Sequence, residues 1–333
     1  MAIPDQETFK NQWRKAISPY QKSDTRKSIA QLANTLIPYF ALLALMVWSL
    51  RFPYWVTLLL AIPTAGFLVR TFIIFHDCGH GSFFKSNRAN TIVGYITGTL
   101  AFTPYERWRH DHAIHHATAG NLDKRGVGDV PTWTVEEFRA APRWKQTLYR
   151  LIRNPIVLFV LSPIPIFVIS YRFFTPKDGK KERLSVIYTD LALLGILLLA
   201  HFTIGIKAYL LVQIPVMWIA GSLGEWLFFV QHQFPAVYWK RQGEWDYLTS
   251  AMDGASYYKL PKVLQWFSGS IGYHHIHHLG PKVPNYNLEK CYTFNPIFQT
   301  AYTITPATSL RCTALKLWDE QSQKLVGFPV VKA

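Results

Sequence analysis

The sequence predicts an all-α polytopic membrane protein with four transmembrane helices in two hairpins, and three observations support this fold class. Half of the 333 residues are hydrophobic and only 17% are charged, against about 25% in an ordinary soluble domain. The chain contains 12 Trp and 17 Tyr, residue types that favour membrane–water interfaces. Its long apolar runs come in closely spaced pairs, which predicts helical hairpins within one domain.

The chain begins with a polar, basic segment, residues 1–30, which lacks the pattern of a cleavable signal peptide. Apolar runs follow at residues 29–50 and 54–74. Each is long enough to cross about 30 Å of hydrocarbon, which takes ~20 residues in a helix. Only three residues, 51–53, separate the two runs, so we expect a tight hairpin.

Two further apolar stretches are not expected to cross the membrane. Residues 91–102 are too short, and we expect them to be re-entrant or interfacial. Residues 154–171 are long enough, but Pro155, Pro163 and Pro165 interrupt helical hydrogen bonding.

The second predicted hairpin consists of residues 186–206 and 208–230, joined at Lys207. We assign residues 31–290 to one membrane domain and residues 291–333 to a C-terminal segment. No internal repeat or flexible linker divides the chain.

Charge and cysteine content narrow the class of protein. The net charge of +15 would suit nucleic acid, but the basic residues flank apolar spans instead of forming a stripe. An anionic membrane surface or an acidic protein partner explains them better. The three cysteines are odd in number and widely spaced, so no disulfide framework is expected and a reducing cytosolic side fits.

Most of the 12 histidines lie in three clusters outside the apolar runs. The clusters read "HDCGH", "HDHAIHH" and "HHIHH", and one more histidine directly follows the last run in "FFVQHQF". Their spacings of i, i+3 and i+4 place the side chains on one face of a helix. Neutral imidazole is a common ligand of Zn, Fe, Cu and Ni, so the clusters predict a metal site.

Nine histidines are candidate ligands, too many for one metal ion and suitable for two. They are His76, His80, His112, His115, His116, His232, His274, His277 and His278. His110 and His275 are not required by the repeated spacing. His201 lies alone within a predicted span, and we expect it to be structural.

The three clusters resemble the histidine boxes HxxxH, HxxHH and HxxHH of the membrane fatty acid desaturases, and the likeness runs from about Asn34 to Tyr286. "FFVQHQF", "NLDKRGVGD" and the residues around the third box are similar to bacterial acyl-lipid desaturases, especially the cold-induced delta-5 type. Relatives often have an acidic residue at the position of Pro235. The resemblance implies that the same nine histidines bind two Fe ions in a cytosolic helical cap, with O2 as co-substrate.

Side chains behind the ligands are expected to orient the imidazoles. The candidates Asp77, Asp111, Asp123 and Asp129 lie within or close behind the boxes, although each could equally be a solvated loop charge. Gln231 is a candidate to hold a water on one metal ion. Trp108 opens the second box, and we expect it to be an interfacial anchor.

A parity argument sets the topology. All boxes must reach one metal pair, so the number of crossings between any two boxes is even. Three apolar candidates separate the second and third boxes, and the proline-broken 154–171 is the one expected not to cross. Basic residues follow it, which stay cytosolic under the positive-inside rule. The four-span result places both termini and every box on the cytosolic side of the cell membrane.

The resemblance implies desaturation of an acyl chain of a membrane phospholipid. A related hydroxylase, ketolase or acetylenase could share the boxes, and a histidine-rich metal transporter is an alternative of another class.

The chain has no redox-cofactor signature, so electrons are expected from an acidic ferredoxin or flavodoxin. A basic cytosolic face is expected to receive this carrier: Arg107, Arg109, Lys124, Arg125, Lys240, Arg241, Lys259 and Lys262.

Overall fold

The structure, a computed structural model, describes residues 6–329, and within them four helices are long and apolar enough to cross a membrane. They are α2 (Thr25–Ser49), α3 (Trp55–His80), α8 (Lys180–Thr203) and α9 (Ile206–His232). Each covers most or all of one predicted apolar run, so the four predicted membrane helices are confirmed in length and composition. The helices α3 and α9 continue beyond their apolar runs and end at predicted ligands.

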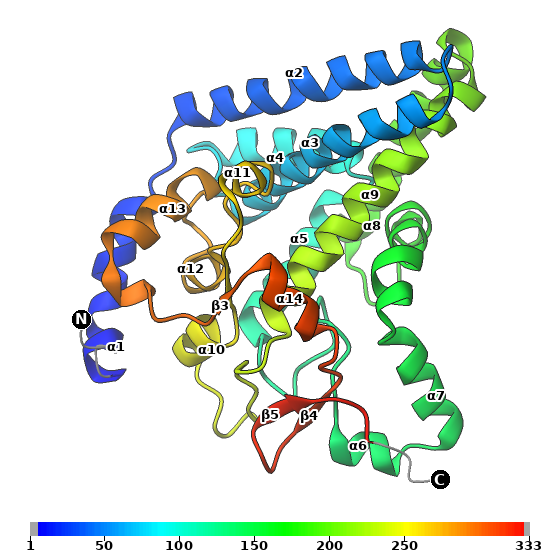
Figure 1. The fold of residues 1–333 in the computed structure, drawn as a ribbon. Coiled ribbons are helices and arrows are strands. Elements are labelled where there is room, and N and C mark those ends of the chain that lie inside the picture. The colour runs from blue at the N-terminus through cyan, green and yellow to red at the C-terminus, as the bar shows by residue number, and fades with distance from the viewer. Residues whose placement is uncertain (1–5, 330–333) are drawn as a thin grey trace.

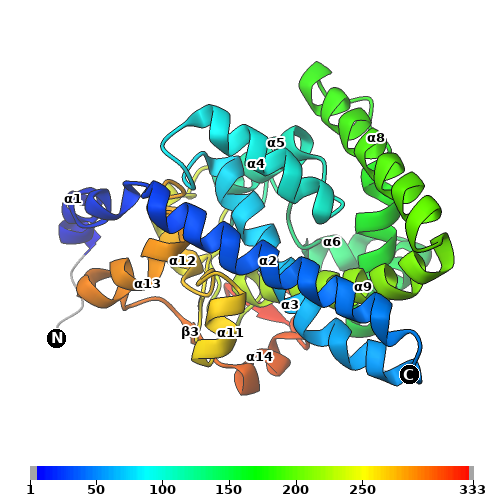
Figure 2. The ribbon, with the colours of Figure 1, turned by 90° about the horizontal axis from the view of Figure 1, so that it is seen from above.

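The turns of both hairpins lie at the same end of the helix bundle (Figure 1). The Tyr54 hydroxyl, beside the first turn, donates a hydrogen bond to the carbonyl of Leu211 in α9 at 2.9 Å. The helices α2 and α3 pack closely along each other. By contrast, α8 diverges from α9 and packs against other helices (Figure 2). The second hairpin is therefore open, and α9 packs mainly against α3 of the first hairpin.

The short apolar stretch at 91–102 lies mainly in α4 (Asn87–Leu100). The Ser86 side chain caps this helix by accepting a hydrogen bond from the Ala89 backbone. At 1.5 Å per residue, its 14 residues extend about 21 Å. That is shorter than the hydrocarbon core, as the sequence predicts.

The proline-rich stretch at 154–171 forms irregular helical turns: η2 (Val157–Leu161) and η3 (Ile164–Ile169) are π-helical, and η4 (Ser170–Arg172) is a 3-10 turn. Prolines 163 and 165 have no N–H to donate, which disfavours regular α-helix here. This stretch bends by 59° from α7 (Arg143–Ile152). Counting the bent pair as one span would raise the total to five, so the non-crossing of 154–171 stays a prediction.

Short elements at the other end of the bundle complete the fold. The helices are α1 (Gln6–Ile17), η1 (Ser18–Gln21), α5 (Tyr105–Thr118), α6 (Val135–Ala140), α10 (Tyr247–Asp253), α11 (Lys262–Phe267), α12 (His274–Leu279), α13 (Asn285–Phe294), η5 (Pro296–Phe298) and α14 (Pro306–Cys312). The strands are β1 (Trp133–Thr134), β2 (Tyr257–Tyr258), β3 (Thr303–Ile304), β4 (Leu317–Asp319) and β5 (Lys324–Val326). Strand β4 pairs parallel with β1 and antiparallel with β5, and β2 pairs parallel with β3.

Both segments assigned outside the membrane domain pack into the same folded unit. The predicted boundary at residue 30 falls within α2, and the boundary at residue 290 falls within α13. The buried Ile17 lies against Gly280, directly after α12. Near the other end of the chain, β4 pairs with β1, which follows the second histidine box. The terminal segments therefore pack beside the third histidine box and against the chain that follows the second one.

Candidate metal centre

Four helices bring the predicted ligands together. The first box lies at the end of α3, the second on α5, the third on α12, and His232 ends α9. The i, i+4 spacing within each box places two imidazoles on one helix face. The additional histidine at i+3 points about 100° away from the one at i+4, toward a second position.

Five histidines form one group: His76, His80, His112, His116 and His277, with one ring nitrogen of each within 4.8 Å of the others. The Nε2 atom of His277 lies 3.0 Å from that of His76 and 2.9 Å from that of His116. The Nε2 atoms of His112 and His116 are 3.1 Å apart. This group contains the i, i+4 pairs of the first and second boxes.

The other four histidines form a second group beside it. Ring nitrogens of His115, His232 and His278 lie within 4.8 Å of one another. The Nε2 atom of His274 is 2.9 Å from that of His232 and 3.1 Å from that of His278. All nine predicted ligands therefore fall into two adjacent groups, and the second and third boxes each contribute to both.

Hydrogen bonds at the opposite ring nitrogen fix three of the nine imidazoles. The Asp77 carboxylate lies 3.0 Å from Nδ1 of His76, and the Asp129 carboxylate lies 2.8 Å from Nδ1 of His115. The carbonyl of Gly254 lies 3.2 Å from Nδ1 of His232. These oxygens can only accept, so Nδ1 donates its proton and Nε2 keeps its lone pair for a metal ion.

Three other candidates do not reach the imidazoles. Asp123 accepts hydrogen bonds from Arg241 at 2.7 Å and from the backbone of Gln242 at 2.8 Å. Gln231 donates to the carbonyl of Ile271 at 3.0 Å. The charges near Asp111 belong to Arg107 and other residues outside the two groups, and burial raises the pKa of this carboxyl. We therefore drop Asp111 and Asp123 as orienting groups, whereas the water-holding role of Gln231 stays a prediction.

The environment keeps the imidazoles neutral. Burial first, and then the neighbouring imidazoles, lower the pKa of five histidines on α5 and α12 well below the ordinary value: His112, His116, His274, His277 and His278. Neutral rings whose lone pairs converge on one point repel one another unless a cation lies between them. The donor set therefore fits two metal ions that accept nitrogen ligands.

The remaining histidines lie outside both groups. The His110 side chain is 57% exposed and faces Glu182 at 4.0 Å. His275 is buried, with Nε2 2.9 Å from the carbonyl of Phe298. His201 is exposed on α8. Their positions agree with the prediction that these three histidines are not part of the metal site.

Trp108 lies against the first group instead of serving only as an interfacial anchor. Its ring stacks on His112 with centroids 4.3 Å apart and planes tilted by 20°, and it contacts the edge of His76. The i, i+4 spacing of Trp108 and His112 on α5 was the available signal. This spacing did not enter the prediction for Trp108, which rested on the preference of Trp for membrane interfaces.

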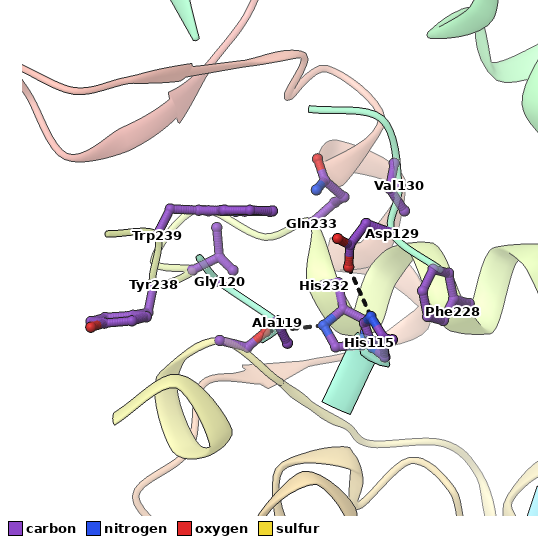
Figure 3. Close-up of a pocket in the computed structure, with 12 residues that line it drawn as sticks. His115, Ala119, Gly120, Asp129, Val130, Phe228, His232, Gln233, Tyr238 and Trp239 are labelled. Carbon is purple, nitrogen blue, oxygen red and sulfur yellow. Dashed lines mark hydrogen bonds and ion pairs between the residues drawn. The ribbon is translucent and has the colours of Figure 1, made fainter. Parts of the chain in front are cut away.

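A small pocket lies beside the second group (Figure 3). His115 and His232 line one side, and Val130, Phe228 and Trp239 supply apolar walls. Gly120 has a φ of +71°, and a Cβ there would lie 2.9 Å from the carbonyl of Tyr238. A glycine is therefore required for the chain to pass this pocket.

Four apolar helices with two histidine groups at one end define a class: a multi-helix membrane protein with a site suited to metal ions. The family model described as fatty acid desaturase matches residues 50–303, well over half of the chain. A fatty acid desaturase of Bacillus subtilis is 46% identical over 321 residues, covering 96% of this chain and 91% of that protein. The chain therefore belongs to the fatty acid desaturase family and is an oxidoreductase.

More distant relatives have names that specify substrates. An sn-1 oleoyl-lipid 12-desaturase of Picosynechococcus is 27% identical, covering 76% of this chain and 71% of that protein. An sn-1 acyl-lipid omega-3 desaturase (ferredoxin) of Nostoc is 28% identical, covering 66% of this chain and 61% of that protein.

Proposed function

We propose that this desaturase introduces a cis double bond into an acyl chain of a membrane phospholipid, with two iron ions, O2 as co-substrate and an external electron carrier. The observation that supports this most is the division of nine histidines into two adjacent groups. The acyl-lipid names of the relatives support the substrate class. A delta-5 position is expected from the resemblance of the sequence.

The iron pair would supply an oxidant, made from O2, that can remove hydrogen from methylene carbons that no base can deprotonate. The chain's own residues hold and orient this pair. The five histidines of one group and the four of the other would be its ligands, and Asp77 and Asp129 hold protons on Nδ1 of His76 and His115. Burial of the second group limits access of water to it.

Expression in a bacterial host tests the proposed reaction. Mass spectrometry of the host lipids should find a new double bond, and locating it gives the regioselectivity. A product with one more oxygen atom would instead indicate a hydroxylase. Purified protein should contain close to two irons per chain, one for each histidine group.

Alanine variants connect the metal to the product. His112→Ala, His277→Ala and His232→Ala should each lower the iron content and abolish the product, because each removes one of the nine predicted ligands. His201→Ala is the matched control, since this histidine is exposed on α8, and it should keep activity. Full activity of His232→Ala would remove His232 from the ligand set.

A further inference from the structure

The two histidine groups differ in their exposure to solvent. His80 and His112 of the five-histidine group are partly exposed, whereas His115, His232 and His278 of the second group are all buried. His274, the remaining member, is buried too. The protein therefore offers a partner one exposed edge of the metal centre, at the end of α3 and along α5.

Cationic side chains border this edge. Lys282 is exposed and its ammonium group donates to the carbonyl of His80 at 2.6 Å. The Arg109 side chain is 50% exposed and pairs with Glu106 at 3.1 Å. Lys85 and Arg88 are exposed on the segment that follows the first box. Within residues 6–329, Lys85, Arg88 and Lys282 form no ion pair.

The broad basic face predicted from the sequence is largely neutralised. Six of its eight cations lie within 4.0 Å of a carboxylate: Arg107, Arg109, Arg125, Lys240, Arg241 and Lys262. Arg241 contacts two carboxylates, those of Asp123 and Glu320. Ion-paired cations attract an approaching anionic surface weakly, because their fields are largely cancelled at a distance. Lys282, Lys85 and Arg88, which form no ion pair within residues 6–329, are therefore better candidates for steering a partner toward His80 and His112.

Trp108 offers an electronic path at the same edge. This side chain is partly exposed, and the next residue is Arg109. Its ring lies directly on that of His112, and other aromatic contacts to Phe72 and Phe75 hold it in place. A π-system in van der Waals contact with a ligand shortens the gap across which an electron must tunnel.

We propose that an acidic ferredoxin-type carrier docks at the edge formed by His80, His112 and Lys282, and that electrons reach the five-histidine group first. This inference rests on the proposed function. Reducing one O2 to two water molecules takes four electrons and four protons. The acyl chain supplies two electrons and two protons as its double bond forms. The carrier supplies the other two electrons in two one-electron steps, and two protons come from solvent.

The test measures how fast purified, iron-loaded protein is reduced under anaerobic conditions. The absorbance change is followed by stopped flow, with either reduced plant-type ferredoxin or dithionite as electron donor. Lys282→Glu combined with Lys85→Glu should slow reduction by ferredoxin about tenfold at low salt, since steering of this type changes encounter rates by such factors. Reduction by the small donor dithionite should stay within about twofold.

Lys259→Glu is the matched control: Lys259 is an exposed cation of the broad face predicted from the sequence, and it follows β2 instead of lying on α3 or α5. It should leave the ferredoxin rate nearly unchanged. Equal rates for the double variant and Lys259→Glu, in protein that binds iron and accepts electrons from dithionite, would overturn the docking site and leave the proposed function intact. If the wild-type protein bound no iron, that result would instead contradict the proposed function.

Substitution of Trp108 tests the path itself. Trp108→Leu should slow reduction by ferredoxin, and Trp108→Phe should restore much of the rate because it retains an aromatic ring on His112. Iron content is measured for both variants, so a loss of metal is separated from a loss of electronic contact. A full ferredoxin rate in iron-loaded Trp108→Leu would exclude this side chain from the path.

Discussion

At the residue scale, the tautomer of each ligand decides whether its Nε2 lone pair is available. One carboxylate oxygen of Asp129 fixes the tautomer of His115 by accepting the proton of Nδ1. The other carboxylate oxygen accepts a hydrogen bond from the backbone of Gly126 at 3.0 Å. Asp77 is held in the same way by the backbone and side chain of Asn285, at 2.6 and 2.8 Å. Both carboxylates are thus oriented by hydrogen bonds to groups other than the predicted ligands.

Asp129→Asn should weaken metal binding, because an amide accepts the proton of His115 less strongly than a carboxylate does. Loss of such a partner typically costs about 10–100-fold in metal affinity. Iron retained after dialysis against a graded series of chelator concentrations measures the effect. Asp123→Asn is the control, since Asp123 contacts Arg241 on the surface. Equal iron retention by the two variants would contradict an orienting role for Asp129.

Arg153 is a second residue whose environment predicts a large effect. Its side chain is fully buried, and Nη2 donates to Gln233 at 2.8 Å and to the carbonyl of Leu315 at 2.9 Å. Since Gln233 follows His232, this guanidinium connects the end of α9 to the C-terminal segment. No carboxylate forms an ion pair with it within the described residues.

Arg153→Met should lower the free energy of unfolding by about 1–3 kcal/mol, because it leaves the buried side-chain oxygen of Gln233 and the partly buried carbonyl of Leu315 without a donor. Thermal unfolding of the purified protein in detergent measures the change. Arg143→Met, at an exposed position on α7, should change it by no more than about 0.5 kcal/mol. A loss of stability as small as that of the control would mean that neighbouring groups or water replace the guanidinium.

At the element scale, the irregular stretch at 154–171 decides the topology. Its last turn is held to α8 by the ion pair of Arg172 and Asp190 at 2.6 Å. Arg172 also donates to the carbonyl of Phe102, just after α4. Both contacts join it to elements on the side of the histidine boxes, which favours a re-entrant path.

Single-cysteine labelling tests this path. Lys180→Cys, at the start of α8, should react with a membrane-impermeant maleimide only after the cells are made permeable. Lys207→Cys, in the first turn of α9, should react in intact cells. The three native cysteines are buried and give a low background. Labelling of the residue-180 variant in intact cells would mean that 154–171 crosses the membrane.

Periodicity and spacing predict the elements of this protein unequally well. The four long helices followed from apolar length, and eight of the nine predicted ligands followed from i, i+3 and i+4 spacing. His232 was added because it directly follows the last apolar run. The roles of Asp77 and Asp129 could not be separated from those of Asp111 and Asp123, because all four lie near a box in sequence. Only the folded chain shows which carboxylates point at a ring nitrogen.

At the scale of the whole molecule, the metal groups connect parts of the chain that are far apart in sequence. His76 and His277 are neighbours across 201 positions, and His115 and His232 across 117. The short helix α12 contains three predicted ligands in six residues, too few residues to form a stable helix alone. Its order therefore depends on packing, and under the proposed function also on metal binding.

Removing iron should consequently loosen the molecule unevenly. Metal binding stabilises the folded state by mass action, and its loss acts where the ligands are. Treatment with a chelator should lower the thermal midpoint and increase hydrogen exchange in α12 and the second half of α5. The helices α2 and α8, which contribute no ligand, serve as internal controls and should exchange as before. Unchanged exchange in α12, in protein shown to have lost its iron, would mean that packing alone holds the third box in place.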